Sequence, residues 1–152
     1  MVKKENVRLQ RLEYGEERIV LDMIRQDNKL TETFSGSRNT LSRIANADYT
    51  ALIKVGNKTV GFIMLVGNGR TGKHEIDMGI LTEYRGKGYG TIALGQLKQI
   101  ILNSEGLDVE IQTSQVNEAA IRSIVKNGFV LCRQDKEYNY YILPSGGKKQ
   151  GR

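Results

Sequence analysis

Residues 85–91 read R-G-K-G-Y-G-T, and the chain around them is best interpreted outward from this stretch. Residues 74–81 before it alternate apolar and polar side chains as a strand does, and residues 92–103 after it repeat apolar side chains at helical spacing. The backbone N–H groups and the positive dipole end at a helix N-terminus favour an anion. Three glycines that can adopt positive φ would let the anion approach the main chain: Gly86, Gly88 and Gly90.

The same glycines would equally suit a tight turn between strand and helix that binds nothing. Their spacing, G-x-G-x-G, also differs from the G-x-G-x-x-G fingerprint of dinucleotide-binding proteins, which follows the first strand of a βαβ unit. Here residues 49–55 and 60–66 read as strands joined by the turn Gly56-Asn57, which predicts an antiparallel meander before residues 74–81. An anion site and a plain turn both remain open at this point.

Periodicity and turn residues predict the other elements. Strands are predicted at residues 7–12, 107–111, 129–132 and 138–143. Helices are predicted around residues 19–24, 41–45 and 117–127, the last of them ending at Gly128. Residues 29–39 are polar and rich in Thr and Ser, which predicts a loop.

A second glycine-rich stretch, residues 67–73, reads G-N-G-R-T-G-K and satisfies most of the P-loop pattern of nucleotide hydrolases. A P-loop needs Ser or Thr after the lysine to bind magnesium, but His74 stands there. It also needs a following helix, whereas the next residues alternate like a strand. We therefore expect residues 67–73 to form a hairpin loop.

Arg85-x-x-Gly88-x-Gly90 resembles the Q/R-x-x-G-x-G/A signature of the GNAT N-acetyltransferase superfamily, whose loop amides bind the pyrophosphate of coenzyme A. Residues 117–129, N-E-A-A-I-R-S-I-V-K-N-G-F, look like the N-x-x-A…G-F helix and strand of that family. The resemblance implies an α/β (α+β) fold: one GNAT-like domain over residues 3–143, with a mixed, mainly antiparallel central sheet flanked by helices on both faces. Residues 144–152 are expected to form a flexible basic tail.

The resemblance also implies acetyl-CoA as co-substrate, and no metal. Main-chain groups on the strand before the loop would meet the pantetheine arm, namely those of Met78, Gly79 and Ile80. Asn117 would contact the same arm. The pyrophosphate would be held by the loop and the start of its helix: Arg85, Gly86, Lys87, Gly88, Tyr89, Gly90 and Thr91.

Acetyl transfer to an amine needs a base, because a lysine-like amine has a pKa near about 10.4. Glu75 and Asp77 lie two residues apart and therefore share one face of the predicted strand. By the resemblance Glu75 is the favoured base, with His74 and Asp77 as second choices, although the pair could instead be a solvated strand face. A backbone N–H near Gly79 or Ile80 would polarise the acetyl carbonyl.

The family often places a tyrosine seven residues after the motif asparagine to protonate the leaving thiolate, and Ile124 stands at that position. Substitutes could be Tyr138, Tyr140 and Tyr141, unless these only pack or line a rim. Cys132 is the one cysteine and has no histidine near it in sequence, so we expect a buried or neutral thiol and no covalent route. A thiolate is a tolerable leaving group without such help, since a thiol titrates near about 8.5.

The formal charge of +6 favours a polyanionic partner, but much of the excess lies at the two ends: Lys3, Lys4, Lys148, Lys149 and Arg152. One cysteine and one histidine exclude a disulfide or a cysteine- or histidine-rich metal site. No apolar run approaches membrane-spanning length and no signal peptide is evident, so we expect a cytoplasmic protein without membrane contact.

The resulting hypothesis is direct acetyl transfer from acetyl-CoA to a primary amine of a small molecule or protein, within a ternary complex. A non-catalytic acyl-CoA-binding or regulatory module is the alternative, because Ile124 replaces the usual tyrosine. A nucleic-acid-binding domain is a weaker one, because no aromatic-basic motif accompanies the charge. The acceptor stays open: residues 29–43 would form its specificity wall, and tyrosines of the final strand would permit a homodimer at a sheet edge.

Overall fold

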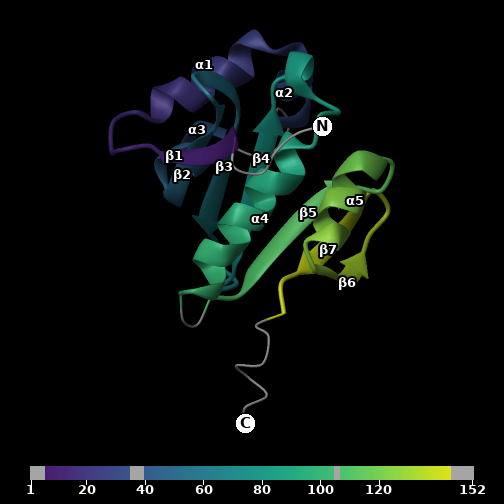
Figure 1. Cartoon of the computed structure of the whole chain (residues 1–152). Coiled ribbons are helices and arrows are strands. Elements are labelled where there is room, and N and C mark those ends of the chain that lie inside the picture. Colours follow the sequence, from purple (N-terminus) through teal and green to yellow (C-terminus); the bar gives the residue numbers. More distant parts are fainter. Residues whose placement is uncertain (1–5, 35–39, 105–106, 145–152) are drawn as a thin grey trace.

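The computed structural model describes residues 6–34, 40–104 and 107–144. They form one seven-stranded sheet in the order β1-β2-β3-β4-β5-β7-β6 (Figure 1). β4 and β5 are parallel, and every other neighbouring pair of strands is antiparallel. The expected fold, a single α/β domain with a mixed and mainly antiparallel sheet, is therefore confirmed.

The strands are β1 (Val7–Arg11), β2 (Ala47–Val55), β3 (Lys58–Gly67), β4 (His74–Ile80), β5 (Val109–Ser114), β6 (Val130–Gln134) and β7 (Tyr138–Ile142). The helices are α1 (Glu17–Gln26), α2 (Asn28–Phe34), α3 (Thr40–Ala45), α4 (Tyr89–Leu102) and α5 (Glu118–Lys126), and the 3-10 helix η2 (Thr82–Tyr84) follows β4. Residues 67–73 join β3 to β4 as the expected hairpin loop. None of the helices in the described part of the chain is long and apolar enough to cross a membrane.

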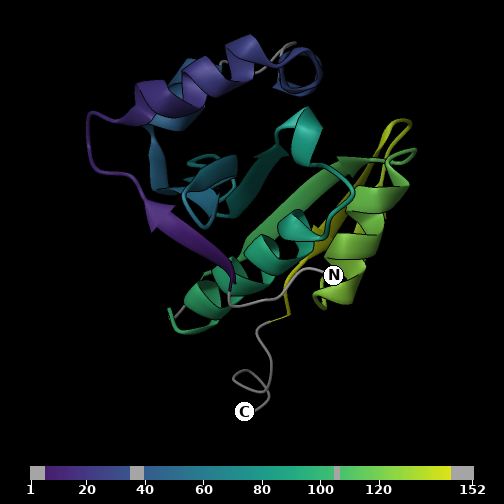
Figure 2. The same cartoon turned by 45° about the horizontal axis from the view of Figure 1, so that its top comes forward.

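The sheet separates two apolar clusters, one on each face. α1, α2 and α3 pack on the first face, over side chains of β2 and β3 such as Phe62 and Met64. α4 and α5 pack on the second face, over residues such as Ile63, Ile76 and Ile111. Figure 2 shows the two groups of helices on opposite sides of the sheet. We call these the α1–α3 face and the α4–α5 face; helices on both faces are as expected.

α2 is the main departure from the predicted elements, because residues 29–34 were expected to belong to a polar loop. Asp27 Oδ1 accepts hydrogen bonds from the backbone N–H groups of Lys29 and Leu30 at 3.1 and 3.2 Å, which starts the helix. Leu30 is then buried against the first-face cluster. One buried leucine and a cap thus outweigh weak local propensity. Residues 35–39 of the same stretch, and the basic tail from residue 145, lie outside the described residues.

The C-terminal strands correct three further expectations. β5 ends at Ser114, three residues beyond the predicted end, because β7 pairs with it along its whole length. β7 lies between β5 and β6, so the final strand is not a sheet edge and its tyrosines cannot form an edge contact. β6 is the edge strand at this end of the sheet, and Cys132 within it is exposed, so of the two expected alternatives, a buried thiol or a neutral one, the buried thiol is wrong. Oligomeric state stays a prediction.

Candidate active site

The first element of the site is the point where β4 and β5 separate. Pairing between these parallel strands covers only His74 with Val109 and Glu75 with Glu110. Beyond Glu75, β4 stays paired with β3 and β5 stays paired with β7. The facing main-chain edges of the two strands are therefore not paired with each other there, which leaves them available to an extended ligand.

Strand geometry indicates which β4 main-chain groups face that gap in pairing. The N–H of His74 donates to Asp108, on the β5 side, at 2.7 Å, and the N–H of Leu81 donates to Val60 of β3 at 2.8 Å. Main-chain groups alternate sides along a strand. Met78 and Ile80 therefore direct their N–H groups toward β5, whereas Gly79 directs its N–H toward β3. Of the three expected pantetheine contacts, this geometry favours Met78 and Ile80.

The glycine loop after η2 is built for a close main-chain approach. Gly86 and Gly88 have φ of 77° and 88°, which non-glycine residues rarely adopt. A Cβ at either position would meet no protein atom within 4 Å, so the space beside the main chain is open there. Gly88 is the N-cap of α4 and offers no side chain, which leaves the first N–H groups of the helix available. These features fit a phosphate group.

Two loop residues link this anion cradle to β4. A Cβ at Gly90, in the first turn of α4, would lie 3.4 Å from the Met78 side chain and 3.5 Å from that of Ile80, which is ordinary van der Waals contact, so the start of α4 packs against the end of β4. Arg85 donates from Nε to the carbonyl of Ile80 at 3.0 Å. Its guanidinium therefore braces the loop against the strand as well as adding positive charge.

Arg43 forms ion pairs with both predicted acidic residues, Glu75 and Asp77, a contact that the sequence did not predict. Arg43 of α3 donates from Nε to Asp77 Oδ2 at 2.8 Å, and its terminal nitrogen lies 3.1 Å from Glu75 Oε1. The Glu75 contact is an ion pair without good hydrogen-bond alignment. Burial alone would lower the pKa of the guanidinium, but the hydrogen bond and charge of Asp77 and the charge of Glu75 raise it. Both carboxylates therefore lie on the α1–α3 face beside a permanent positive charge.

His74, a second-choice base, lies on the opposite face of β4 from Glu75, as alternation along the strand requires. Its Nε2 lies 2.8 Å from Oδ2 of Asp48, which is near the start of β2. The structure therefore brings Glu75 and Asp77 together and does not bring His74 to them.

These elements match a known family. Residues 10–129 match the model of the Acetyltransferase (GNAT) family, which is most of the chain. The chain belongs to the GNAT family. A search of curated proteins gave no match. By family the protein is an acetyl-CoA-dependent N-acetyltransferase.

Solved structures similar to this GNAT protein include acetyltransferases with different acceptors. The spermidine N-acetyltransferase from Vibrio cholerae in complex with CoA and spermine has a TM-score of 0.71 and 15% identity, over 91% of this chain and 95% of that one. RimL, the ribosomal L7/L12 alpha-N-protein acetyltransferase in complex with coenzyme A, has a TM-score of 0.70 and 13% identity, over 90% and 93%. Such identities show a shared fold and do not indicate the acceptor.

Asn117 begins the second GNAT motif, and here it caps α5. Its Oδ1 accepts a hydrogen bond from the N–H of Ala120 at 3.2 Å. Its Nδ2 is a donor of the type that a pantetheine carbonyl accepts. Because β4 and β5 are parallel, the start of α5 and the glycine loop lie at the same end of the sheet. The predicted cofactor contact is compatible with this position and stays a prediction.

α4 and α5 are joined by polar contacts next to the cofactor loop. The hydroxyls of Thr91 and Ser123 are hydrogen-bonded to each other, and Asn127 Nδ2 donates to the carbonyl of Thr91 at 3.1 Å. A Cβ at Gly95 would lie 3.0 Å from Asn127 Oδ1, so the helices meet closely there. The Thr91 side chain is thus engaged with α5, and its backbone N–H remains the group suited to a phosphate.

The residues considered for protonating the thiolate do not form an obvious acid. Ile124, at the family's tyrosine position, is 2% exposed and belongs to the second-face core. Tyr141 is buried, and its hydroxyl accepts a hydrogen bond from Asn139. Tyr140 donates to Asp135 at 2.7 Å, and this hydrogen bond, with burial and the Asp135 charge, raises the pKa of its phenol. The hydroxyls of Tyr140 and Tyr141 therefore have structural partners, and a role of Tyr138 as the acid stays a prediction.

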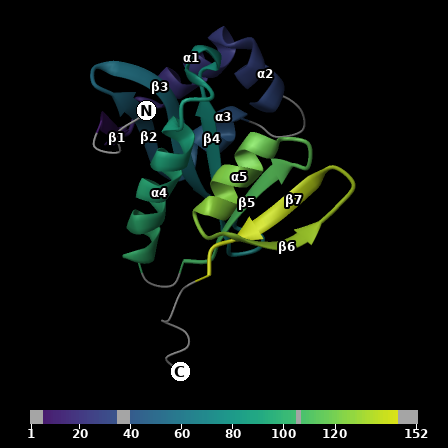
Figure 3. The same ribbon diagram turned by 45° about the vertical axis from the view of Figure 1, so that its right-hand side comes forward.

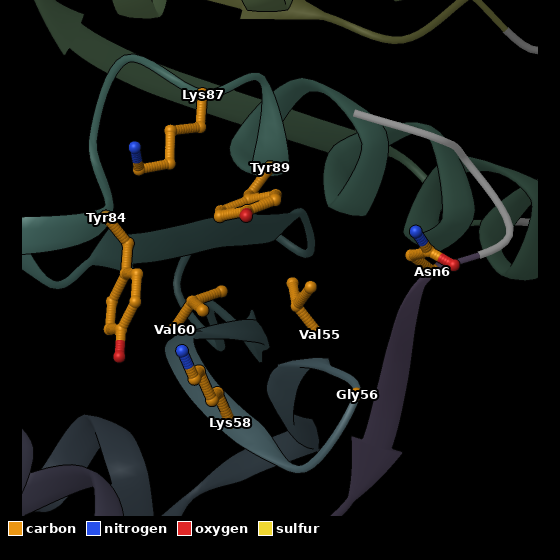
Figure 4. A pocket seen from close by; sticks show the side chains of 8 residues that line it. All are labelled: Asn6, Val55, Gly56, Lys58, Val60, Tyr84, Lys87 and Tyr89. Carbon is orange, nitrogen blue, oxygen red and sulfur yellow. The ribbon is translucent and has the colours of Figure 1, made fainter. Parts of the chain in front are cut away.

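A pocket of about 450 Å³ adjoins the glycine loop on the side away from β5 (Figure 4). It lies beside the turn between β2 and β3 and is lined by Asn6, Val55, Gly56, Lys58, Val60, Tyr84, Lys87 and Tyr89. Figure 4 shows the side chains of Lys87 and Tyr89 on this side of the loop. The side chains of Lys87 and Tyr89 therefore border this hollow, and the predicted contact of these two residues with the pyrophosphate would have to use their main chain.

The sequence did not single out two charged residues at the site, Arg43 and Glu110, although Arg43 is the last residue of the predicted specificity wall at residues 29–43. Arg43 comes from a short helix 34 residues before Asp77, so no local pattern links the two. Glu110 was included in the strand predicted at residues 107–111 from the alternation of apolar and acidic residues, with no role assigned to it. In the structure it is 5% exposed. The only sign of Glu110 in the sequence was a carboxylate within a predicted strand. Its place next to Glu75 follows from the pairing of β5 with β4 in the structure.

Proposed function

We propose that this GNAT protein transfers the acetyl group of acetyl-CoA directly to a primary amine bound on the α1–α3 face of the sheet. The observation that carries the proposal is one arrangement: the glycine cradle at the start of α4 adjoins the separation of β4 and β5, and Glu75 and Asp77 lie on the same strand. Acetyl-CoA would supply a thioester, whose carbonyl an amine can attack.

The cofactor contacts in this proposal use main-chain groups. The N–H groups of Gly88, Tyr89 and the next residues of α4 would bind the pyrophosphate, with help from the helix dipole. The N–H groups of Met78 and Ile80 both point toward β5. Because the pyrophosphate would lie beyond Ile80 and the acetyl group is at the other end of the cofactor, the N–H of Ile80 would bind the pantetheine arm, and that of Met78, nearer to Glu75, would polarise the acetyl carbonyl as a one-donor oxyanion site. Asn117 would contact the arm through its Nδ2.

Glu75 is proposed as the general base that takes the proton of the amine, directly or through water. Asp77 is the second candidate, and Arg43 orients both carboxylates. The attacking nitrogen would form the new amide bond as the thioester carbon–sulfur bond breaks. The sulfur would leave as a thiolate, and solvent would protonate it, because Ile124 offers no acid.

The first prediction concerns turnover itself. Purified protein with acetyl-CoA and a panel of primary amines is expected to release free thiol, with at least one acceptor well above the rate without amine. Thiol release would be followed with a chromogenic disulfide reagent, after subtracting protein thiol. Because Cys132 is exposed and reacts with such a reagent, the assay would be repeated with Cys132→Ser, which is expected to turn over equally.

The competing proposal, a non-catalytic acyl-CoA-binding module, rests on the buried Ile124. Tight acetyl-CoA binding by calorimetry, together with no thiol release for any amine in the panel, would support that module and reject the enzyme. A nucleic-acid-binding role would be supported by salt-dependent retention on DNA that persists after the residues beyond Leu143 are removed.

The second prediction concerns the base. Glu75→Gln keeps the size of the side chain but cannot accept the amine proton, so kcat is expected to fall by about a hundredfold or more. Acetyl-CoA affinity, measured by calorimetry, should change less than about twofold, because no cofactor contact involves this side chain. Glu13→Gln, an exposed carboxylate outside the site, is the matched control and should retain full activity.

A full loss of kcat in Asp77→Asn with near-normal activity in Glu75→Gln would transfer the base role to Asp77. Retained kcat in both single variants and in the double variant would reject carboxylate base catalysis at this site.

A further inference from the structure

Glu110 is a buried carboxylate beside the proposed base. It is the register partner of Glu75 on the neighbouring parallel strand, so both side chains lie on the α1–α3 face, about 5 Å apart between strand axes. Its side chain is 7% exposed. It also marks the last paired position before β4 and β5 separate. The mechanism proposed above makes no use of it.

Two cations lie near Glu110, but neither comes close enough to form a good hydrogen bond with its carboxylate. Lys73 Nζ lies 3.6 Å from Oε2, and an Arg133 nitrogen lies 3.6 Å from Oε1, both beyond good hydrogen-bond distance. Among the described residues, Oε2 has no hydrogen-bond partner although it is buried. Both cations are long and substantially exposed, at 42% and 57%. A buried carboxylate without a hydrogen-bonded counter-charge is costly, so a cationic ligand would be stabilised there.

The surroundings of Glu110 favour a cationic ligand. Glu75, Asp77 and Glu110 form one acidic row on the α1–α3 face, and Arg43, whose side chain is 19% exposed, pairs with Glu75 and Asp77. Ile142 and Val130 follow Glu110 in register on the same face, on the side away from Glu75, and are 36% and 51% exposed. They offer an apolar surface to a carbon chain that extends beyond Glu110.

The part of the α1–α3 face around Glu110 is not covered by the apolar cluster of that face. The sheet members of that cluster come from β2 and β3, under α1, α2 and α3. Figure 3 shows β5, β7 and β6 extending to one side of these three helices. Gln112 and Tyr140, the polar neighbours of Glu110 along this face, are half-exposed. To reach the row, an acceptor would displace the side chain of Lys73 and the guanidinium of Arg133, which also lies over the Tyr140 ring at 3.7 Å from its centroid.

We propose that Glu110 binds a second, non-reacting ammonium of the acceptor and thereby selects small diamines or polyamines over monoamines. The inference rests on the proposed function, since Glu75 must lie where the reacting amine is deprotonated. The non-reacting ammonium would donate to Oε2 of Glu110 and replace the two distant cations. Glu110 is then a specificity-determining residue, not a base.

The test compares matched acceptors that differ only in the second ammonium. With saturating acetyl-CoA, kcat/KM would be measured for 1,4-diaminobutane and for butylamine with wild type and Glu110→Gln. The wild type is expected to prefer the diamine by at least about tenfold, the range expected for a hydrogen bond to a buried charge. Glu110→Gln should remove that preference through the KM of the diamine, and butylamine should change less than about twofold. Glu137→Gln, an exposed carboxylate in the turn before β7, is the control.

Calorimetric titration of 1,4-diaminobutane into each protein gives a readout that does not need turnover, and only the wild type and the control should bind it. Equal losses of kcat/KM for both amines in Glu110→Gln would assign Glu110 a structural role and overturn the inference. An unchanged preference in Glu110→Gln, or a wild type without preference, would overturn it too. A wild type that releases no thiol with any amine would reject the proposed function, while calorimetry would still decide whether Glu110 binds a diamine.

Discussion

Gly88→Val is expected to weaken acetyl-CoA binding by at least about a hundredfold while the protein stays folded. Gly88 has φ of 88°, and valine is strained in that conformation, so the loop must either rearrange or carry the strain. The Cβ would also project into the space where the pyrophosphate is proposed to bind. Loss of two or more charge-assisted main-chain hydrogen bonds accounts for the expected size of the effect.

The matched control is Gly15→Val, in the turn between β1 and α1. Gly15 has φ of 95° and, like Gly88, open space around a built Cβ. It therefore carries the same backbone strain at a position outside the glycine loop, and its acetyl-CoA affinity should equal that of wild type. Affinity would be measured by calorimetry and folding by circular dichroism. Unchanged affinity in folded Gly88→Val would reject the assignment of the cofactor loop.

Gly61→Ala is expected to lower the free energy of unfolding by about 2–3 kcal/mol, and to impair turnover as well. A Cβ at Gly61 would lie 2.2 Å from the carbonyl oxygen of Gly79 and 3.1 Å from the Cα of Ile80. Both contacts are with backbone, so β3 and β4 must move apart where β4 presents its proposed cofactor contacts. No side-chain rotation relieves that overlap.

Gly69→Ala is the control for Gly61→Ala. Gly69 lies in the β3–β4 loop, where a Cβ would meet nothing within 4 Å, so stability should change by less than about 0.5 kcal/mol. Urea denaturation followed by circular dichroism would give the free energies of both variants. If Gly61→Ala proved as stable as wild type, the close approach of β3 to the end of β4 would be wrong.

The cofactor end of the site was largely predictable because its determinants are local. Glycines that allow positive φ, followed at once by an amphipathic helix, place backbone donors and a helix dipole at one point, whatever surrounds them. The observed φ values of Gly86 and Gly88 and the start of α4 at Tyr89 agree with that interpretation. Alternation likewise predicted that Glu75 and Asp77 share a face, and Arg43 contacts both.

Elements whose formation depends on distant contacts were predicted less well. α2 forms because Asp27 caps it and Leu30 is buried, although its residues read as a polar loop. Asp27 also accepts hydrogen bonds from the backbone and hydroxyl of Thr82, in η2, at 2.9 and 2.7 Å. Desolvation raises the pKa of Asp27, but the hydrogen bonds from Thr82, Leu30 and Lys29 together lower it. The start of α2 and the segment leading to the cofactor loop are therefore joined by one side chain.

The sequence by itself determined the glycine loop, the order of the seven strands and the family that both indicate, because these follow from backbone preferences and short-range periodicity. Only the tertiary structure decided the electrostatics of the acceptor side. Arg43 reaches Asp77 across 34 residues, and Glu110 becomes buried only because β5 pairs with β4 on one side and β7 on the other. The burial of a charge and the distance to its counter-charge depend on packing between segments far apart in the chain, and no local pattern encodes them.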